Sequence, residues 1–393
     1  MRMHCDIKYK DLYNRSPENI AFCGYRIAPL GAHIDHQAGK ILGCAIDKGI
    51  HIAYSRKNSG ICELHSLNFP EKRAQFHVND IPDSKVGDWA DHCRGAAKML
   101  GEQYPLRYGI SGVIEGELPI GGLSSSASVI IAFLTALAEV NRISLDDWEL
   151  IMMAKKAENA YVGVNCGKLD QSCEVLGRRN RWLYLDCADD SYTLVSGTDR
   201  PYAFAVFFSG LERSLANSAY NLRQDECKAA AYSLLAHAGM PYGKFRDTVL
   251  RDVPYAVYEE YGDRLPAAFR KRATHFFTEL ARVEKGVDAW RSGNLEEFGR
   301  LVFESGKSSI DNYECGCPEL IRLYEIMTDT DGIYGGRFSG AGFKGCCMAL
   351  IDPAKSESVL RHVEEEYLKT FPGMRGKFMG AMCALADGVG AVL

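Results

Sequence analysis

The chain has 393 residues, of which 47% are hydrophobic and 25% charged, and its formal net charge is −5. This is the composition of a soluble globular protein that is long enough for two domains. Acidic and basic residues are interspersed, and the longest apolar run, residues 127–138, is too short to cross a bilayer. We therefore expect no nucleic-acid partner and no membrane span.

Fourteen cysteines are scattered along the chain without the spacing of a disulfide framework. The first fifteen residues, MRMHCDIKYKDLYNR, contain no apolar segment of the kind found in signal peptides. Cys315 and Cys317 are too close for the usual metal-binding pair, and no second pair accompanies them. The cysteines therefore indicate free thiols in a reducing, cytoplasmic compartment.

Residues 20–55 alternate apolar and small residues, which predicts two strands joined by a polar loop. Four functional side chains lie within eleven residues here, namely Arg26, His33, Asp35 and His36. The pattern His-x-Asp-His could be half of a metal site, but a zinc hydrolase would need further ligands at comparable spacing. The other interpretation is a polar loop with hydrogen-bonded histidines.

Residues 61–67 and 74–80 are a predicted strand pair, and a helix is expected over residues 88–100. Trp89 begins that helix, where its ring could pack in the core or provide a stacking platform for a base. A strand over residues 108–115 then leads into a loop rich in glycine and serine.

This loop opens the stretch 118–140, LPIGGLSSSASVIIAFLTALAEV. Gly121 and Gly122 permit a tight turn, Ser124 to Ser126 supply hydroxyl and N–H donors, and helical composition begins at Ala127. The free N–H groups and the positive end of such a helix bind phosphate. An ordinary serine-capped core helix is the alternative, and a Walker loop is excluded because no Gly-Lys-Ser/Thr follows.

Residues 145–159 predict an amphipathic helix with Glu158 near its end. After a turn at Cys166 and Gly167, Asp170 begins another helical stretch. A carboxylate there could accept a proton from a hydroxyl, and Glu158 could hold a divalent metal. Either carboxylate could equally be a solvated surface charge.

The second half predicts strands over 181–186 and 202–209, with a domain boundary near residue 197. Amphipathic helices over 218–239, 267–293 and 294–309 are expected to build the core and to carry no chemistry. A second glycine-rich turn spans residues 337–345, and a strand, a helix over 355–371 and a terminal strand pair follow. This order predicts helices packed on an antiparallel sheet.

Several of these segments together resemble GHMP-type small-molecule kinases of the galactokinase subgroup. GYRIAPLGAHIDHQAGKIL is similar to the galactokinase signature, LPIGGLSSSAS to the phosphate loop and RFSGAGFKGCC to the third glycine-rich motif. CGKLDQS resembles the segment with the active-site aspartate, SAYNLRQDEC the one with a sugar-contacting tyrosine, and DWADHCRG the one with a tryptophan near adenine. The resemblance covers nearly the whole chain.

This resemblance implies an α+β, two-domain GHMP kinase fold. Residues 1–196 would form the N-terminal domain, like ribosomal protein S5 domain 2, and residues 197–393 a ferredoxin-like C-terminal domain. It implies transfer of phosphate from ATP to a sugar with Mg²⁺, in a cytoplasmic monomer or weak homodimer.

The resemblance also assigns site residues by motif. It implies that Asp170 accepts or orients the proton of the attacking hydroxyl and that Arg26 stabilises charge near it. Sugar contacts fall on Ala32, His33, Asp35, Gly167 and Tyr220, and magnesium ligands on Ser126 and Glu158. The ATP contacts fall on Trp89, Gly121, Gly122, Leu123, Ser124, Ser125, Ser126 and Ala127.

Three departures from the family pattern bear on function. The phosphate loop is one residue shorter than usual, Lys344 replaces a glycine of the third motif, and Ala32 stands where galactokinases carry a glutamate. Because that glutamate contacts the 6-hydroxyl end of the sugar, its loss points to D-galacturonate as substrate, as in plant-type galacturonokinases, with D-galactose as the alternative. A non-catalytic sugar sensor is the third possibility, although the serine-rich loop and Asp170 are intact here.

Overall fold

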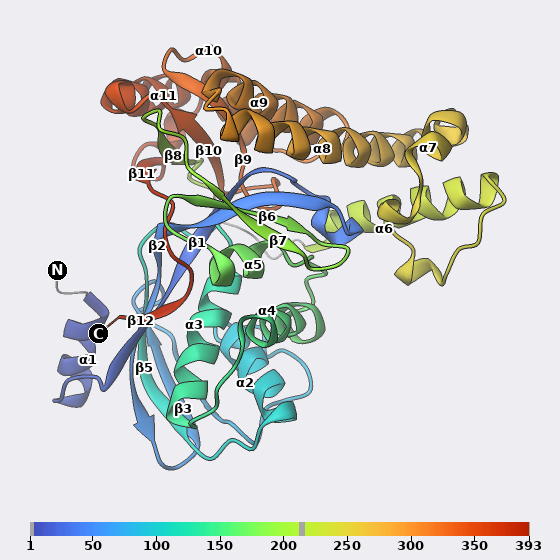
Figure 1. The fold of residues 1–393 in the computed structure, drawn as a ribbon. Helices are drawn as coiled ribbons and strands as arrows, with labels where there is room; N and C mark the ends of the chain where they lie inside the picture. Colours follow the sequence, from blue (N-terminus) through green and yellow to red (C-terminus); the bar gives the residue numbers. More distant parts are fainter. Residues whose placement is uncertain (1–3, 212–216, 393) are drawn as a thin grey trace.

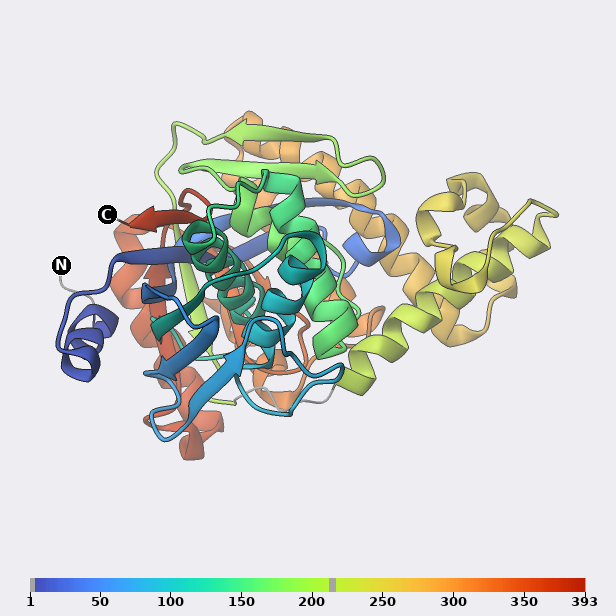
Figure 2. The ribbon, with the colours of Figure 1, turned by 90° about the horizontal axis from the view of Figure 1, so that it is seen from below.

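The computed structural model describes residues 4–211 and 217–392. Within them the strands form two separate sheets, each covered by its own helices (Figure 1). The first and last described elements, helix α1 (His4–Tyr13) and strand β12 (Gly390–Val392), lie on the same side of the molecule in Figure 1 and Figure 2. No helix in the described residues is both long and apolar enough to cross a membrane.

The first sheet has eight strands and carries most of the first half of the chain. The main path runs β12-β1-β2-β5-β3-β4, and β6 and β7 extend from the other part of β2. All pairs are antiparallel except β3 with β5. The strands are β1 (Asn19–Leu30), β2 (Lys40–Lys57), β3 (Ile61–Ser66), β4 (Arg73–His77), β5 (Gly109–Gly116), β6 (Arg181–Asp186), β7 (Tyr192–Ser196) and β12 (Gly390–Val392).

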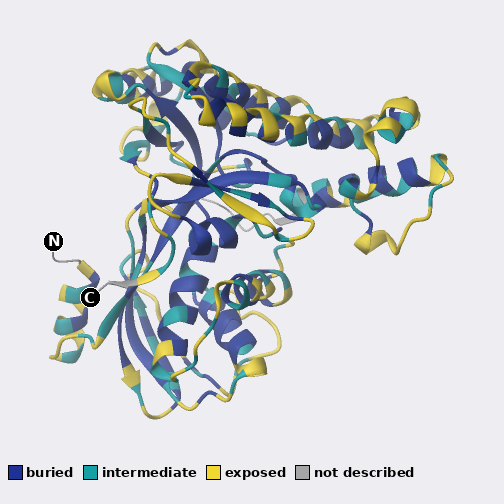
Figure 3. Ribbon diagram, viewed as in Figure 1, coloured by how far each residue is buried: buried dark blue, intermediate teal, exposed yellow. Residues whose placement is uncertain are grey.

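Helix α3 (Ser125–Val140) is the centre of the helical layer on this sheet. Its apolar residues are nearly all buried, because it packs against β1, β2 and β5 on one side and against other helices on the other. Figure 3 shows much of α3 and of the facing strands in the dark blue of buried residues. The other helices of the layer are α2 (Asp91–Gln103), α4 (Asp147–Lys156) and α5 (Leu169–Leu176), with a π-helix (Ala157–Val162) continuing α4.

The second sheet is antiparallel, with strand order β11-β8-β10-β9. Helices α9 and α10 pack on β9, α11 packs on β11, and α6, α7 and one end of α8 extend away from the body in Figures 1 and 2. Its strands are β8 (Ala203–Phe208), β9 (Ile333–Phe338), β10 (Cys346–Ile351) and β11 (Met379–Cys383). Its helices are α6 (Asn217–His237), α7 (Tyr255–Tyr261), α8 (Ala267–Arg291), α9 (Leu295–Asp311), α10 (Pro318–Asp329) and α11 (Ser356–Thr370).

The predicted terminal strand pair is wrong. β11 pairs with β8 in the second sheet, whereas β12 crosses back to pair with β1 in the first. The expected segment 197–393 thus returns its last strand to the first sheet, and the division at residue 197, which falls between β7 and β8, stays a prediction.

Candidate active site

Two cavities meet at the glycine- and serine-rich loop between β5 and α3. The first lies among this loop, the turn after β1, the start of α5 and the connection from β9 to β10. The second lies toward β3 and the start of α2. Five residues line both cavities, so molecules held in the two would meet at this loop: Gly122, Ser124, Ser126, Glu158 and Val164.

Asp170 lies on the first cavity, and both of its oxygens are held. Nε of Arg26 donates to Oδ1 at 2.7 Å, and the hydroxyl of Ser124 donates to Oδ2 at 2.7 Å. Burial by itself lowers the pKa of the Arg26 guanidinium, but the charge of Asp170 outweighs this effect and keeps that pKa above its ordinary value. The carboxylate is thereby fixed in orientation at the cavity wall.

The loop after β1 brings His33 and Asp35 to the same cavity. The ring of His33 is stacked on Tyr313, with centroids 4.1 Å apart, and its Nε2 lies 3.6 Å from the Sγ of Cys315. Burial, followed by the charge of Arg337, lowers the pKa of His33 well below its usual value, so the ring is neutral. No group of three or more His, Cys, Asp or Glu in the described residues could hold a metal ion.

Asp35 faces the start of α5. Its Oδ2 accepts the N–H of Leu169 at 3.2 Å, next to Gly167. Burial and the nearby Asp170 raise the pKa of Asp35. Tyr220, on α6, completes this side of the cavity.

The glycine- and serine-rich loop before α3, residues 118–127, is the phosphate-loop candidate. Its backbone contacts the second glycine-rich turn, residues 337–345. A β-carbon on Gly345 would lie 2.6 Å from the carbonyl carbon of Gly121, so the two backbones touch. Ser124, at the N-cap of α3, is in the left-handed conformation (φ 62°) and makes no capping hydrogen bond, since its hydroxyl donates to Asp170. The first N–H groups of α3 are therefore left for an anion.

Glu158 lies in the π-helix rather than at the end of an α-helix as predicted. It is buried, and its Oε2 accepts hydrogen bonds from Nε2 of Gln171 and from the thiol of Cys166. Such π-helical turns are frequent at functional sites. Together with Ser126, Glu158 places two oxygen donors where both cavities meet.

The second cavity has an aromatic wall. Trp89 and Phe69 are stacked with ring centroids 6.4 Å apart, and both line the cavity. Trp89 precedes α2 instead of beginning it, and it is half-buried. Trp89 also packs against the hydrophobic core of the first sheet, so both predicted interpretations, core packing and a stacking platform, stay open.

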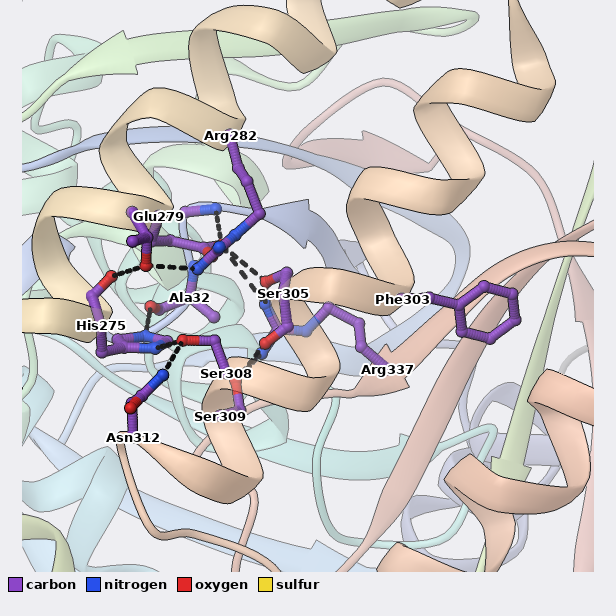
Figure 4. Close-up of polar contacts among 12 residues, drawn as sticks. Ala32, His275, Glu279, Arg282, Phe303, Ser305, Ser308, Ser309, Asn312 and Arg337 are labelled. Atoms are coloured by element: carbon purple, nitrogen blue, oxygen red, sulfur yellow. Dashed lines mark hydrogen bonds and ion pairs between the residues drawn. The ribbon is translucent and has the colours of Figure 1, made fainter. Parts of the chain in front are cut away.

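Helices α8 and α9 do more than build the core, since they also carry buried polar side chains that contact the loop after β1 or one another. Figure 4 shows a buried polar network in which α8 holds the loop after β1. Nε2 of His275 donates to the carbonyl of Ala32 at 2.9 Å, and Oε1 of Glu279 accepts from the N–H groups of Gly31 and Ala32. Since a carbonyl only accepts, His275 carries its proton on Nε2, and Nδ1 accepts from Ser308.

Sequence reasoning also missed Arg337, which lines the first cavity from β9. Two signals were available. Arg337 is a charged residue within a short stretch of small and aromatic residues, IYGGRF, and His275 and Glu279 are four residues apart, which places them on one helix face.

Models of known protein families match the two parts of the chain that contribute to this site. Residues 91–178 match the GHMP kinases N terminal domain, and residues 284–369 match the GHMP kinases C terminal region. The galacturonokinase of Arabidopsis thaliana is 38% identical, over 95% of this chain and 93% of that protein. A galactokinase of Clostridium perfringens (strain 13 / Type A) is 31% identical, over 90% of this chain and 91% of that protein.

Solved structures show the same likeness. Lactococcus lactis galactokinase complexed with galactose superposes with a TM-score of 0.90 at 26% identity, covering 98% of each chain. Methanococcus jannaschii mevalonate kinase superposes with a TM-score of 0.65 at 16% identity, covering 94% of this chain and 98% of that one, which shows the fold alone. The predicted α+β, two-domain fold is confirmed.

Proposed function

Because this chain belongs to the GHMP kinase family and matches sugar kinases over most of its length, we propose that it phosphorylates the anomeric hydroxyl of D-galacturonate with ATP, giving galacturonate 1-phosphate. The observation that carries the reaction is the held carboxylate of Asp170, which lies on the first cavity beside the phosphate-loop candidate. The observation that supports a uronic acid is the uncharged Ala32 on the same cavity wall.

Asp170 is proposed to accept or orient the proton of the attacking hydroxyl. Its Oδ1 and Oδ2 are already bound by Arg26 and Ser124, so the carboxylate does not need to reorganise when the sugar arrives. Arg26 also donates through Nη1 to the carbonyl of Gly122, which links the catalytic pair to the phosphate-loop candidate. Phosphoryl transfer depends mainly on such positioning and charge stabilisation.

ATP is proposed to lie across both cavities. The adenine would occupy the second cavity against Trp89, and the phosphates would lie over the loop from Gly121 to Ala127, at the open N-terminus of α3. The transferred phosphate would then face the first cavity, where the sugar binds. The five residues shared by the two cavities lie at this junction.

The residues at the junction fit a magnesium ion. Mg²⁺ is usually bound through one or two carboxylates together with substrate phosphates, and Glu158 and the hydroxyl of Ser126 are oxygen donors that line both cavities. When bound, the ion would neutralise charge on the phosphates. Gln171 and Cys166 hold the Glu158 carboxylate in place from behind.

The sugar is proposed to contact Ala32, His33, Asp35, Gly167 and Tyr220, which all line the first cavity. We further propose a cytoplasmic location and a monomer or weak homodimer. The location is supported by the cysteines, since all fourteen lie in the described residues and are free thiols.

The test is a kinase assay with D-galacturonate, D-galactose and D-glucuronate, in which ADP release is followed and the product is identified by ³¹P NMR. We expect the largest kcat/KM for galacturonate and a phosphate on the anomeric oxygen. If kcat/KM for galactose is equal or higher, the proposed substrate is wrong, but the proposed reaction, phosphorylation of a sugar by ATP, still holds. Absence of ADP release with every sugar would favour a non-catalytic sensor.

A further inference from the structure

Two buried arginines line the first cavity, and their partners differ. Arg26 is paired with Asp170 at 2.7 Å. The guanidinium of Arg337 is also buried, but within the described residues the one carboxylate at ion-pair distance is Glu279, whose Oε1 lies 3.8 Å from Nη1. The other oxygen of Glu279, Oε2, is bound by Nε of Arg282 at 2.8 Å, so a single carboxylate is shared between two cations.

The remaining partners of Arg337 carry no charge. Its Nη1 donates to the hydroxyl of Ser305, its Nη2 to the hydroxyl of Ser309, and its Nε to its neighbour's carbonyl, at Phe338 (Figure 4 shows the serine contacts). These bonds use three of the five guanidinium N–H groups. Burial lowers the pKa of Arg337 and Glu279 offsets this only in part, whereas the pKa of Arg26 is raised by its own carboxylate.

Arg337 is linked through Glu279 to Ala32, the residue in the loop after β1 that departs from the galactokinase pattern. Oε1 of Glu279, which faces Arg337, also accepts from the N–H of Ala32 at 3.3 Å. The carbonyl of Ala32 is bound by His275. Both peptide groups of Ala32 are therefore fixed, its N–H by the same carboxylate that faces Arg337, and its methyl group adds no charge to the cavity wall.

We propose that Arg337 is the specificity-determining cation of this site, and that its charge balances the carboxylate of a uronic acid bound against Ala32 and His33. The inference rests on the proposed function and names the group that selects the acid. The ion-pair cluster that binds the peptide groups of Ala32 holds two cations, Arg337 and Arg282, and one carboxylate, Glu279, while His33 and His275 are neutral, so this cluster carries one positive charge in excess. Asp35 lies on the same cavity wall, and burial and the charge of Asp170 raise its pKa. A substrate carboxylate supplies the missing negative charge in a region of low dielectric constant, and a neutral hexose does not.

Arg337 can be changed without leaving an isolated buried charge, whereas a change at Glu279 leaves the guanidinium of Arg337 buried without a carboxylate. In Arg337→Gln, Glu279 keeps Arg282 and the donors of Gly31, Ala32 and Ser305. In Glu279→Gln, the mostly buried Arg282 keeps its contact with Thr278, and Arg337 keeps the hydroxyls of Ser305 and Ser309. Thermal unfolding is therefore measured beside the kinetics of this variant. The two variants alter the charge next to Ala32 in opposite directions.

The experiment measures kcat/KM for galacturonate and galactose in the native protein, Arg337→Gln, Arg337→Lys and Glu279→Gln, at saturating ATP. The readout is the ratio of galacturonate to galactose. We expect Arg337→Gln to lower this ratio about a hundredfold, Glu279→Gln to raise it about tenfold, and Arg337→Lys to stay within about fivefold of native because the charge is retained. A purely structural role would lower the activity toward both sugars and leave the ratio unchanged.

The outcomes separate the inference from the proposed function. A native protein that phosphorylates galactose but not galacturonate overturns the proposed substrate and this inference with it. A native preference for galacturonate with an unchanged ratio in Arg337→Gln, or a lowered ratio in Glu279→Gln, overturns the inference alone. Should Arg337→Gln fail to fold by circular dichroism, the direction of the ratio in Glu279→Gln decides.

Discussion

The backbone of Gly167 lies directly against the carboxylate of Asp35, so closely that a β-carbon at residue 167 would fall 2.1 Å from Oδ2. The same oxygen accepts the N–H of Leu169, at the start of the helix that carries Asp170. Any side chain at residue 167 must therefore displace Asp35. The contact ties a proposed sugar-binding carboxylate to the backbone beside the proposed catalytic one.

We predict that Gly167→Ala raises KM for the sugar at least tenfold with a much smaller effect on KM for ATP. The added methyl group must displace the carboxylate of Asp35, and Asp35 is proposed to contact the sugar. Steady-state kinetics with each substrate varied in turn provide the measurement. Gly243→Ala is the matched control, because a β-carbon there meets nothing within 4 Å. Equal effects of the two substitutions would show that the contact has no role in sugar binding.

We predict that Asp170→Asn lowers kcat by two to four orders of magnitude, because an amide cannot take the proton of the attacking hydroxyl. The substitution also leaves Arg26 buried without its counter-charge, so thermal unfolding must be measured to separate lost catalysis from lost structure. Sugar binding by isothermal titration calorimetry should persist. Nearly native kcat in a folded Asp170→Asn protein would refute the proposed role.

The order of elements around the site is predictable from local pattern. Residues 108–140 show a strand, a glycine turn and an apolar helix in sequence, and the structure places β5 and α3 there. Each of these patterns depends on neighbouring residues only. Glycine and serine favour turns and helix caps, and the spacing of apolar residues marks the buried face of a helix or strand.

What local pattern cannot predict is contact between distant segments. Ala32 meets His275 across 243 residues, and β12 joins β1 from opposite ends of the chain. Because α8 is charged on one face, the sequence alone suggests that Glu279 is a solvated side chain. The fold shows instead that Glu279 is buried against the loop after β1. The site roles themselves stay predictions from the motifs.

We predict that acid destabilises the protein between pH 6.5 and 4 partly through His275. Burial lowers the pKa of this ring to about 4, whereas the unfolded chain binds the proton near pH 6.5. In that window the unfolded state therefore binds more protons, so the free energy of unfolding falls as pH falls, by up to about 1.4 kcal/mol per pH unit for this group. Its contribution is complete above pH 6.5.

Urea unfolding at pH 7, 6 and 5 measures this effect. His275→Gln keeps a donor for the carbonyl of Ala32 and removes the titrating ring, so the slope against pH should become shallower. His362→Gln, at an exposed position on α11, serves as the control and should leave the slope unchanged. The same slope in native protein and His275→Gln would contradict the assignment.

The last prediction concerns Ala32, whose peptide groups are clamped by Glu279 and His275, so that a longer side chain there must enter the cavity. A glutamate about 4 Å from a substrate carboxylate would cost about 4 kcal/mol at an effective dielectric constant of 20, or about a thousandfold in kcat/KM. A neutral 6-hydroxyl sugar would instead gain a hydrogen bond of about 0.5 to 1.5 kcal/mol. In Ala32→Glu, kcat/KM for galacturonate should therefore fall much more than kcat/KM for galactose.

Ala32→Gln is the matched control, because glutamine has nearly the same size and no charge. Its kcat/KM for galacturonate should stay within about tenfold of the native value, since only steric crowding and an added dipole distinguish this variant from the native protein. Comparison of kcat/KM for both sugars in the three proteins thus separates charge from volume. If Ala32→Glu and Ala32→Gln lose galacturonate equally, crowding explains the effect; if Ala32→Glu keeps it, residue 32 does not select the acid.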